Sequence, residues 1–183
     1  MAKIRQPNPV LLFTGILYSS EESCNKAINE LEACFGDIMA QSPVYKWEHT
    51  DYYKDELGDN IKRKFIIFRH PVDPSLLSDA KIKTNTLEQE LSVNSKRTVN
   101  IDPGYITPAK IVLASTKDYS HRIYLKDGIY AEVTLIYTKG RLTPHTYTYR
   151  DFKNPDIITF FTASRRLLWA IKHEISAKKA ESQ

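Results

Sequence analysis

The chain has 183 residues, which is enough for one domain with a substantial core and too few for two. Hydrophobic residues make up 42% of it and charged residues 26%, and the presence of only six glycines excludes collagen-like or low-complexity material. No apolar run reaches the roughly 20 residues that cross a bilayer, and the apolar run at 10–18 leads into acidic residues, unlike a secretory signal. We therefore expect one cytoplasmic domain over residues 1–183, with no membrane partner and with frayed tails at 1–9 and 177–183.

The formal net charge of +4 conceals an uneven distribution of charge along the chain. Residues 21–59 contain ten acidic and three basic side chains, whereas residues 96–126 contain six basic and two acidic side chains. The overall charge therefore says little about nucleic acid. The local excess of cations at 96–126 indicates a candidate site for an anion.

The first third of the chain alternates between strand and helix patterns. Residues 10–18 are almost continuously apolar, which predicts a strand buried on both faces. Ser19 and Glu22 form a capping-box pattern, apolar residues then recur at helical spacing, and Gly36 is the expected end of the helix. Three further segments follow: a predicted strand at 43–49, an exposed polar loop at 50–60 and a strand at 61–70.

A second helix and a fourth strand complete the predicted core. Asp73 and Pro74 are an N-cap and a first helical residue, and helical spacing of apolar residues follows them. Residues 100–107 contain Asp-Pro-Gly at 102–104, which favours a tight turn, so we expect the fourth strand at 110–116. The order β-α-β-β-α-β is typical of a ferredoxin-like, or split βαβ, fold of the α+β class.

The rest of the chain predicts further antiparallel strands and a C-terminal helix. Turn dipeptides at 127–128 and 139–140 indicate hairpins. Alternation across residues 129–137 places Glu132 in mid-strand on the less apolar face. Asn-Pro at 154–155 indicates the start of a long amphipathic helix. The additional strands are expected at 121–125, 129–137 and 145–149.

Long polar-and-apolar motifs fill the centre of the chain: NIDPGY at 100–105, KIVLASTKD at 110–118 and HRIYLKDGIYAEVTL at 121–135. They resemble a bacterial family known as domain of unknown function 4416. Shorter motifs extend the resemblance over nearly the whole chain: LFTGILYS at 12–19, TDYY at 50–53 and TYRDF at 148–152. The resemblance implies no particular reaction. The resemblance also brings the label GTP-binding, which some members of the family carry. This sequence does not support that label, because it lacks the GxxxxGK[ST] phosphate loop, and TKDY at 116–119 lacks the spacing of a guanine-reading motif.

Cations at the ends of predicted neighbouring strands form the first candidate site, with Lys110, Lys117, His121 and Arg122 as its members. Such side chains can converge on one oxyanion, because Arg supplies a planar bidentate fork and Lys a point charge. The ordinary alternative is that they are solvated charges paired with acidic neighbours, namely Asp118, Asp127 or Glu132.

Two groups of carboxylates are the next candidates. Asp102 is either a general base or metal ligand beside the basic cluster, or the first residue of a tight turn. The acidic loop can either hold Mg²⁺ or Mn²⁺ or remain solvated, and its oxygen and nitrogen ligands would come from His49, Asp51, Asp55, Glu56 and Asp59. Tyr52 and Tyr53 are either residues that close on a ligand or packing aromatics.

The leading hypothesis is a protein that binds a phosphate-bearing small molecule, such as a nucleotide, in a cleft formed by residues 100–132, with a divalent cation such as Mg²⁺ as the candidate cofactor. The ligand-binding residues would be Asn100, Lys110, Lys117, Asp118, Arg122, Tyr52 and Tyr53. If the protein is an enzyme, the catalytic residues would be Asp102, His121 and Glu132. The alternative is a non-catalytic module that binds RNA or a protein, although the acidic first third would repel a long polyanion.

Overall fold

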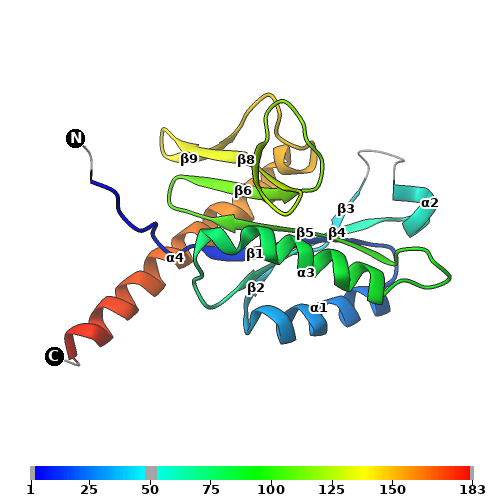
Figure 1. The fold of residues 1–183 in the computed structure, drawn as a ribbon, viewed down its shortest axis with the longest axis horizontal. Coiled ribbons are helices and arrows are strands. Elements are labelled where there is room, and N and C mark those ends of the chain that lie inside the picture. Colours follow the sequence, from blue (N-terminus) through cyan, green and yellow to red (C-terminus); the bar gives the residue numbers. More distant parts are fainter. Residues whose placement is uncertain (1–2, 48–52, 182–183) are drawn as a thin grey trace.

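The structure is a computed structural model that describes residues 3–47 and 53–181 (Figure 1). In this part of the chain nine strands form one antiparallel sheet, with the order β2-β4-β1-β5-β6-β8-β7, while β3 pairs with β4 and β9 with β8. The strands are β1 (Leu11–Tyr18), β2 (Ile38–Gln41), β3 (Tyr45–Lys46), β4 (Lys62–Phe68), β5 (Val99–Ile106), β6 (Lys110–Ser115), β7 (Ile123–Lys126), β8 (Ile129–Thr138) and β9 (Arg141–Pro144). The helices are α1 (Glu21–Phe35), α2 (Lys54–Leu57), α3 (Leu77–Glu90) and α4 (Pro155–Glu181), with 3-10 turns η2 (Pro74–Leu76) and η3 (Asp151–Lys153).

The predicted α+β class and ferredoxin-like core are confirmed. The segments β1, α1, β2, β4, α3 and β5 follow one another with the sheet order β2-β4-β1-β5. Capping residues mark several ends of the helical segments. Ser20, one residue after the predicted Ser19, caps α1, and Gly36 ends it with a φ of 87°. Asp73 accepts from Ser75 at 2.8 Å, and Asn154 accepts from Asp156 at 2.8 Å.

The fourth strand of the core is β5, not the predicted segment at 110–116, and Asp-Pro-Gly at 102–104 lies inside it. β5 pairs with β1 from Val99 to Ile106, so the turn expected at these residues does not form. Pro103 is tolerated because the N–H and C=O groups of successive residues in a strand point to opposite neighbours, so those of residues 101 and 103 point to the same side. Ile101 directs both groups toward α3, and Pro103 shares that side, where its missing N–H breaks no bond to β1.

Two later predictions also need correction. The strand expected at 145–149 lies instead at β9, because the turn at 139–140 closes a tight hairpin in which Thr138 pairs with Arg141. The alternation expected across β8 breaks where Ile111 pairs with Leu135 but Val112 pairs with Val133, which leaves Thr134 as an extra residue. Glu132 and Thr134 are both buried, so the less apolar face of β8 is not exposed at these two residues. The second strand of the core is β2 at Ile38–Gln41 and not the segment predicted at 43–49, of which Tyr45–Lys46 form only the short β3 beside β4. Residues 48–49 lie outside the described residues.

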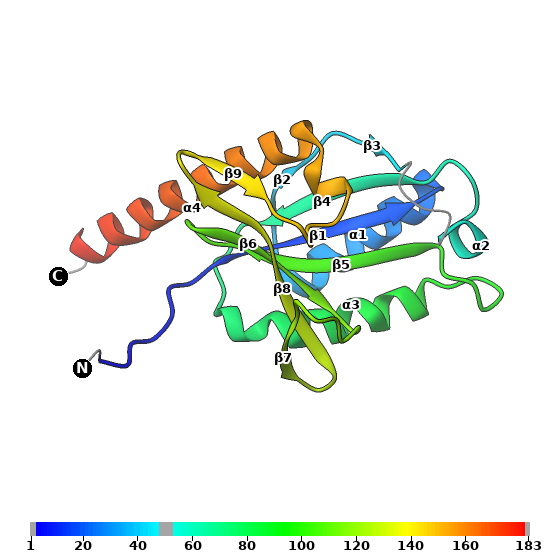
Figure 2. The same cartoon turned by 90° about the horizontal axis from the view of Figure 1, so that it is seen from above.

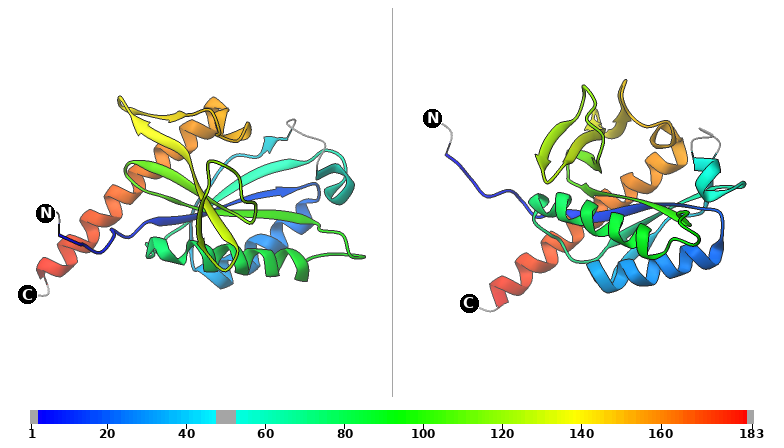
Figure 3. Two further views of the ribbon diagram at one scale, coloured as in Figure 1. Left: turned by 45° about the horizontal axis from the view of Figure 1, so that its top comes forward. Right: turned by 45° about the vertical axis from the view of Figure 1, so that its right-hand side comes forward.

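Helices cover both faces of the core sheet (Figure 3). Leu12, Ile16 and Tyr18 of β1 pack with the core that includes α1 and α3, whereas Leu11 and Phe13 pack with the core that includes α4. The end of α4 projects beyond the sheet (Figure 1). A membrane-spanning segment is not found among the helices of the described residues, since none is both long and apolar enough.

Candidate functional site

A pocket of about 220 Å³ opens where β5 and β6 separate. The two strands pair at residues 104–106 of β5, and toward the start of β5 they diverge (Figure 2). This pocket, the fork pocket, is lined by Asn100 and Asp102 of β5, by residues 113–117 at the end of β6, and by side chains from other elements: Leu17, Trp47, Tyr53, Arg63, Lys81, Asn85, Glu88, Arg97, Tyr149 and Asp151.

Charged side chains of α3 occupy the edge of β5 that β6 leaves open. The backbone N–H of Ile101 donates to Glu88 Oε1 at 2.6 Å, and the ammonium of Lys81 donates to the Ile101 carbonyl at 3.0 Å. Burial raises the pKa of Glu88, although Lys81 and the Ile101 N–H oppose that shift. The two side chains thus satisfy backbone groups that would otherwise be buried without partners.

Asp102 is the centre of the floor of the fork pocket. Its carboxylate accepts from Lys81 at 3.3 Å, from Arg63 at 3.4 Å and from the Asn100 amide at 2.9 Å. Desolvation acts to raise the pKa of Asp102, but the nearby cations Lys81 and Arg63 outweigh it and lower that pKa. The carboxylate is therefore ionised at neutral pH, and it holds a proton too weakly to favour the role of general base.

Arg63 of β4 reaches this floor because Gly15 makes room for it. A Cβ atom at Gly15 would lie 2.8 Å from Arg63 Nη2 and 2.9 Å from Phe65 Cε1. The guanidinium lies over the Phe65 ring, 4.9 Å from its centroid, and its Nε is 3.3 Å from Asp151 Oδ2. Gly15, within the motif at 12–19, is thus a requirement of the pocket floor.

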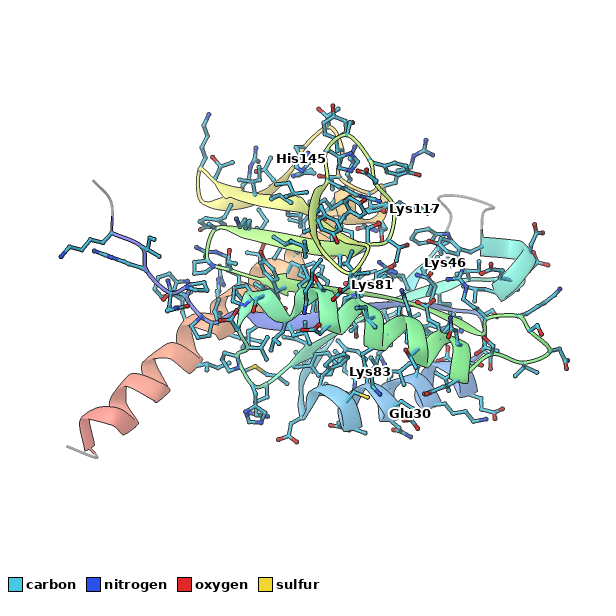
Figure 4. All side chains as sticks on the ribbon, in the orientation of Figure 1. Glu30, Lys46, Lys81, Lys83, Lys117 and His145 are labelled. Carbon is cyan, nitrogen blue, oxygen red and sulfur yellow. The ribbon has the colours of Figure 1, made fainter. Side chains whose placement is uncertain are left out.

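The rim of the fork pocket carries further cations and aromatic rings. Arg97 donates to Glu88 at 2.9 Å and to Asn100 at 3.1 Å. Lys117 follows the end of β6, and Lys81 lies on α3 (Figure 4). Trp47 and Tyr53 pack edge to face with their ring centroids 6.0 Å apart. The pocket therefore combines charges of both signs with flat apolar surfaces.

A second polar cluster supports one wall of the pocket. Arg122 donates to Glu132 Oε2 at 2.8 Å, and His121 Nε2 lies 3.0 Å from the same oxygen. The Arg122 guanidinium also donates to Ser115 Oγ at 2.6 Å, to the Lys117 carbonyl at 2.9 Å and to the Tyr149 hydroxyl. Since Ser115, Lys117 and Tyr149 all line the fork pocket, the Arg122–Glu132 pair positions that wall.

Aromatic rings complete this second cluster. His121 stacks on Tyr147 with ring centroids 4.6 Å apart, and the Arg122 guanidinium lies 4.6 Å from the centroid of the Tyr119 ring. Burial raises the pKa of Tyr149 to about 12, a shift that Arg122 opposes and Glu132 supports. Tyr149 therefore stays protonated at neutral pH, so its hydroxyl keeps a hydrogen to donate while it accepts from Arg122.

The structure divides the predicted site residues among several places. Asn100, Asp102, Lys117 and Tyr53 line the fork pocket, and His121, Arg122 and Glu132 form the cluster behind its wall. Lys110 lies at the opposite end of β6, where it is exposed and pairs with Ile136. Asp118 is exposed beside Tyr130, outside the residues that line the pocket. Tyr52 lies outside the described residues.

Sequence reasoning missed the pocket residues that lie outside the predicted cleft region at 100–132. Arg63 was detectable as a charge on the same strand face as Phe65 and Ile67, both of which are buried. Lys81 and Glu88 lie beside the apolar stripe of α3 and are two helical turns apart, so they lie on the same face of the helix. This spacing is the signal that both could contact the same segment, which is Ile101 of β5.

The acidic loop does not assemble as a metal centre in the described residues. Across residues 3–47 and 53–181, no group of three or more His, Cys, Asp or Glu side chains is placed to hold a metal ion. Glu56 instead pairs with Arg97, and Asp55 and Asp59 are exposed. His49 and Asp51 lie outside the described residues.

Comparisons with known proteins give one match. The family model for domain of unknown function 4416 matches residues 8–168. Neither the curated proteins nor the solved structures gave a significant match.

Proposed function

The chain belongs to the family of domain of unknown function 4416, and we propose that it uses the fork pocket to bind a small anionic metabolite that carries a phosphate or carboxylate group. The observation that carries this proposal is the burial of two cations, Arg63 and Lys81, at the floor of a pocket that is open to solvent. Their side chains are 4% and 8% exposed. Buried ion pairs add little net stability compared with apolar packing, so their place in a pocket favours a role in binding.

The charges of the lining residues support an anion over a cation. Arg63, Lys81, Arg97 and Lys117 line the fork pocket, against three carboxylates, Glu88, Asp102 and Asp151. The cations lie on four separate segments of the chain, so they meet through the fold and not through their order in the sequence. A guanidinium and an ammonium at the rim would draw the anionic group of the ligand toward Arg97 and Lys117.

The size of the fork pocket supports a small ligand. Its volume of about 220 Å³ exceeds the ~150 Å³ that holds benzene. It falls below the roughly 300–1,000 Å³ of sites for drug-sized molecules. A short sugar phosphate or a hydroxy acid fits this size better than a whole nucleotide, whose base would extend into solvent.

The test is a thermal-shift and calorimetric screen of inorganic phosphate, sugar phosphates, hydroxy acids and nucleotides, with and without Mg²⁺. A ligand at about 100 times its Kd raises the free energy of unfolding by about 2.7 kcal/mol. We expect Lys117→Ala to weaken binding about tenfold and the matched control Lys110→Ala, at the other end of the same strand, to leave it unchanged. A screen in which no anion stabilises the protein, or equal effects of the two variants, would contradict the proposal.

The RNA-binding alternative has less support. An RNA-recognition sheet stacks bases on aromatic side chains of an open face. Here β1 and β4 contribute buried residues to the cores on both faces of the sheet. Binding of generic RNA with a steep dependence on salt would favour the alternative over a small ligand.

A further inference from the structure

Asp102 is the acceptor that the fork pocket offers to a ligand. Its side chain is 28% exposed, whereas those of Glu88 and Asp151 are 6% and 4% exposed. An ionised carboxylate has about four positions that accept hydrogen bonds. Within residues 3–47 and 53–181, Lys81, Arg63 and Asn100 use three of them, two at distances of 3.3 and 3.4 Å. One position that can accept a hydrogen bond is therefore left on the Asp102 carboxylate. Its contacts with Lys81 and Arg63 are long, so they also leave its oxygens partly accessible from the pocket.

We infer that the anionic metabolite is hydroxylated, a sugar or polyol that carries a phosphate or carboxylate, and that one of its hydroxyl groups donates to Asp102. This inference rests on the proposed function. It follows from the exposure of Asp102 to the pocket, from the cations that contact it and from the aromatic side chains that line the same pocket.

The two neighbouring cations decide which donor Asp102 accepts. Lys81 and Arg63 already place two positive charges within 3.4 Å of its oxygens. A ligand ammonium at the remaining position would be repelled by both of them, and the local dielectric makes that repulsion stronger than in water. A neutral hydroxyl supplies the hydrogen bond without a third positive charge. An alcohol therefore suits this site better than an amine.

The rest of the lining suits the same kind of molecule. Asn85 also lines the pocket, and an asparagine amide offers both a donor and an acceptor, as neighbouring hydroxyl groups require. Trp47, Tyr53 and Tyr149 present ring faces and edges, against which the C–H face of a sugar ring can pack. Arg97, whose side chain is 29% exposed, and the exposed Lys117 also line the pocket, and their cationic groups would hold the anionic group of the ligand. Hydroxyl recognition at the floor and anion recognition at the rim thus divide the pocket between two ends of one ligand.

The experiment compares ligands that share a phosphate and differ in the second group. Isothermal titration of the full chain uses glycerol 3-phosphate against propyl phosphate, ribose 5-phosphate against 2-deoxyribose 5-phosphate, and phosphoethanolamine as the amine. We expect at least one hydroxylated ligand to bind about tenfold or more tightly than its deoxygenated partner, because a site built to accept from a hydroxyl discriminates against its absence. We expect phosphoethanolamine to bind no better than propyl phosphate.

The variants Asp102→Asn and Asp118→Asn sharpen the comparison. The first should reduce the preference for the hydroxylated ligand to about twofold, and the second, an exposed carboxylate outside the pocket lining, should leave it intact. If Asp102→Asn does not fold, the ratio of wild-type affinities for the hydroxylated and deoxygenated ligands still tests the inference. Equal affinity for hydroxylated and deoxygenated phosphates, or tighter binding of the amine, would overturn this inference while the proposed function stands. Failure of every phosphate and hydroxy acid to bind would overturn both.

Discussion

The Arg122–Glu132 pair allows a quantitative test of how the wall of the fork pocket is held. Their side chains are 1% and 2% exposed, so the pair is almost fully removed from water. Removing one partner of a buried pair typically costs 3–5 kcal/mol, because the other charge stays buried without compensation. Glu132→Gln can still accept from Arg122, so we expect a loss of about 3 kcal/mol in the free energy of unfolding, at the low end of that range. For a chain of this size the melting temperature would fall by roughly 6–12 °C.

The assay is urea unfolding followed by circular dichroism, with Asp79→Asn as the control. Asp79 pairs with Lys126 at 2.7 Å, but these side chains are 50% and 49% exposed and the pair is screened by solvent, so breaking it should leave the free energy of unfolding almost unchanged. Glu132→Gln should also weaken ligand binding, since Arg122 holds Ser115 and Tyr149 in the pocket wall. Equal losses of stability in the two variants would refute the argument that burial makes the Arg122–Glu132 pair indispensable.

Two further predictions concern the pocket floor. Gly15→Ala should lower the free energy of unfolding by about 1–3 kcal/mol, because its Cβ would displace the Arg63 guanidinium and the Phe65 ring; unchanged stability in urea unfolding would contradict it. The second prediction concerns pH. The pKa of Asp102 in the folded protein lies below its ordinary value of 3.8, so the stability it contributes is present above that value and is lost as the pH falls through the folded pKa. The difference in stability between the wild type and Asp102→Asn should therefore shrink below about pH 4, and a difference that grows in acid would show that the sign is wrong.

Local signals in the sequence were sufficient for most of the fold. Asp127-Gly128 and Lys139-Gly140 adopt positive φ values, from 49° to 83°, as their predicted turns require. The cap residues Asp73 and Asn154 also act locally, each through a bond to a residue two positions later. Such interactions depend on neighbours in the sequence, so a pattern can reveal them.

The errors arose where distant partners overrode a local preference. Asp-Pro-Gly at 102–104 favours a turn in isolation, but eight pairings with β1 keep these residues extended. The extra residue at Thr134 depends on the register between β6 and β8, and the burial of Glu132 depends on its contacts with His121 and Arg122, which precede it by eleven and ten residues. Neither effect has a signature within the segment concerned.

The candidate site was predictable in part for the same reason. Asn100, Asp102 and Lys117 were found because they lie in one polar stretch of the sequence that also lines the pocket. Arg63 was missed, since it lies 39 residues before Asp102 on a strand that otherwise reads as apolar core. A buried charge on an apolar strand face is the general signal that such a partner exists elsewhere in the fold.

The divergence of β5 and β6 explains why charge collects at this place. A strand that loses its neighbour leaves backbone N–H and C=O groups that need partners. At Ile101 those partners are the side chains of Glu88 and Lys81, and Lys81 then reaches Asp102. Arg63 approaches Asp102 from the other side through the space at Gly15. The separation that opens the pocket therefore also explains why charged residues lie at its edge. The need to pair the backbone of Ile101 does not explain why the Asp102 carboxylate is exposed to the pocket.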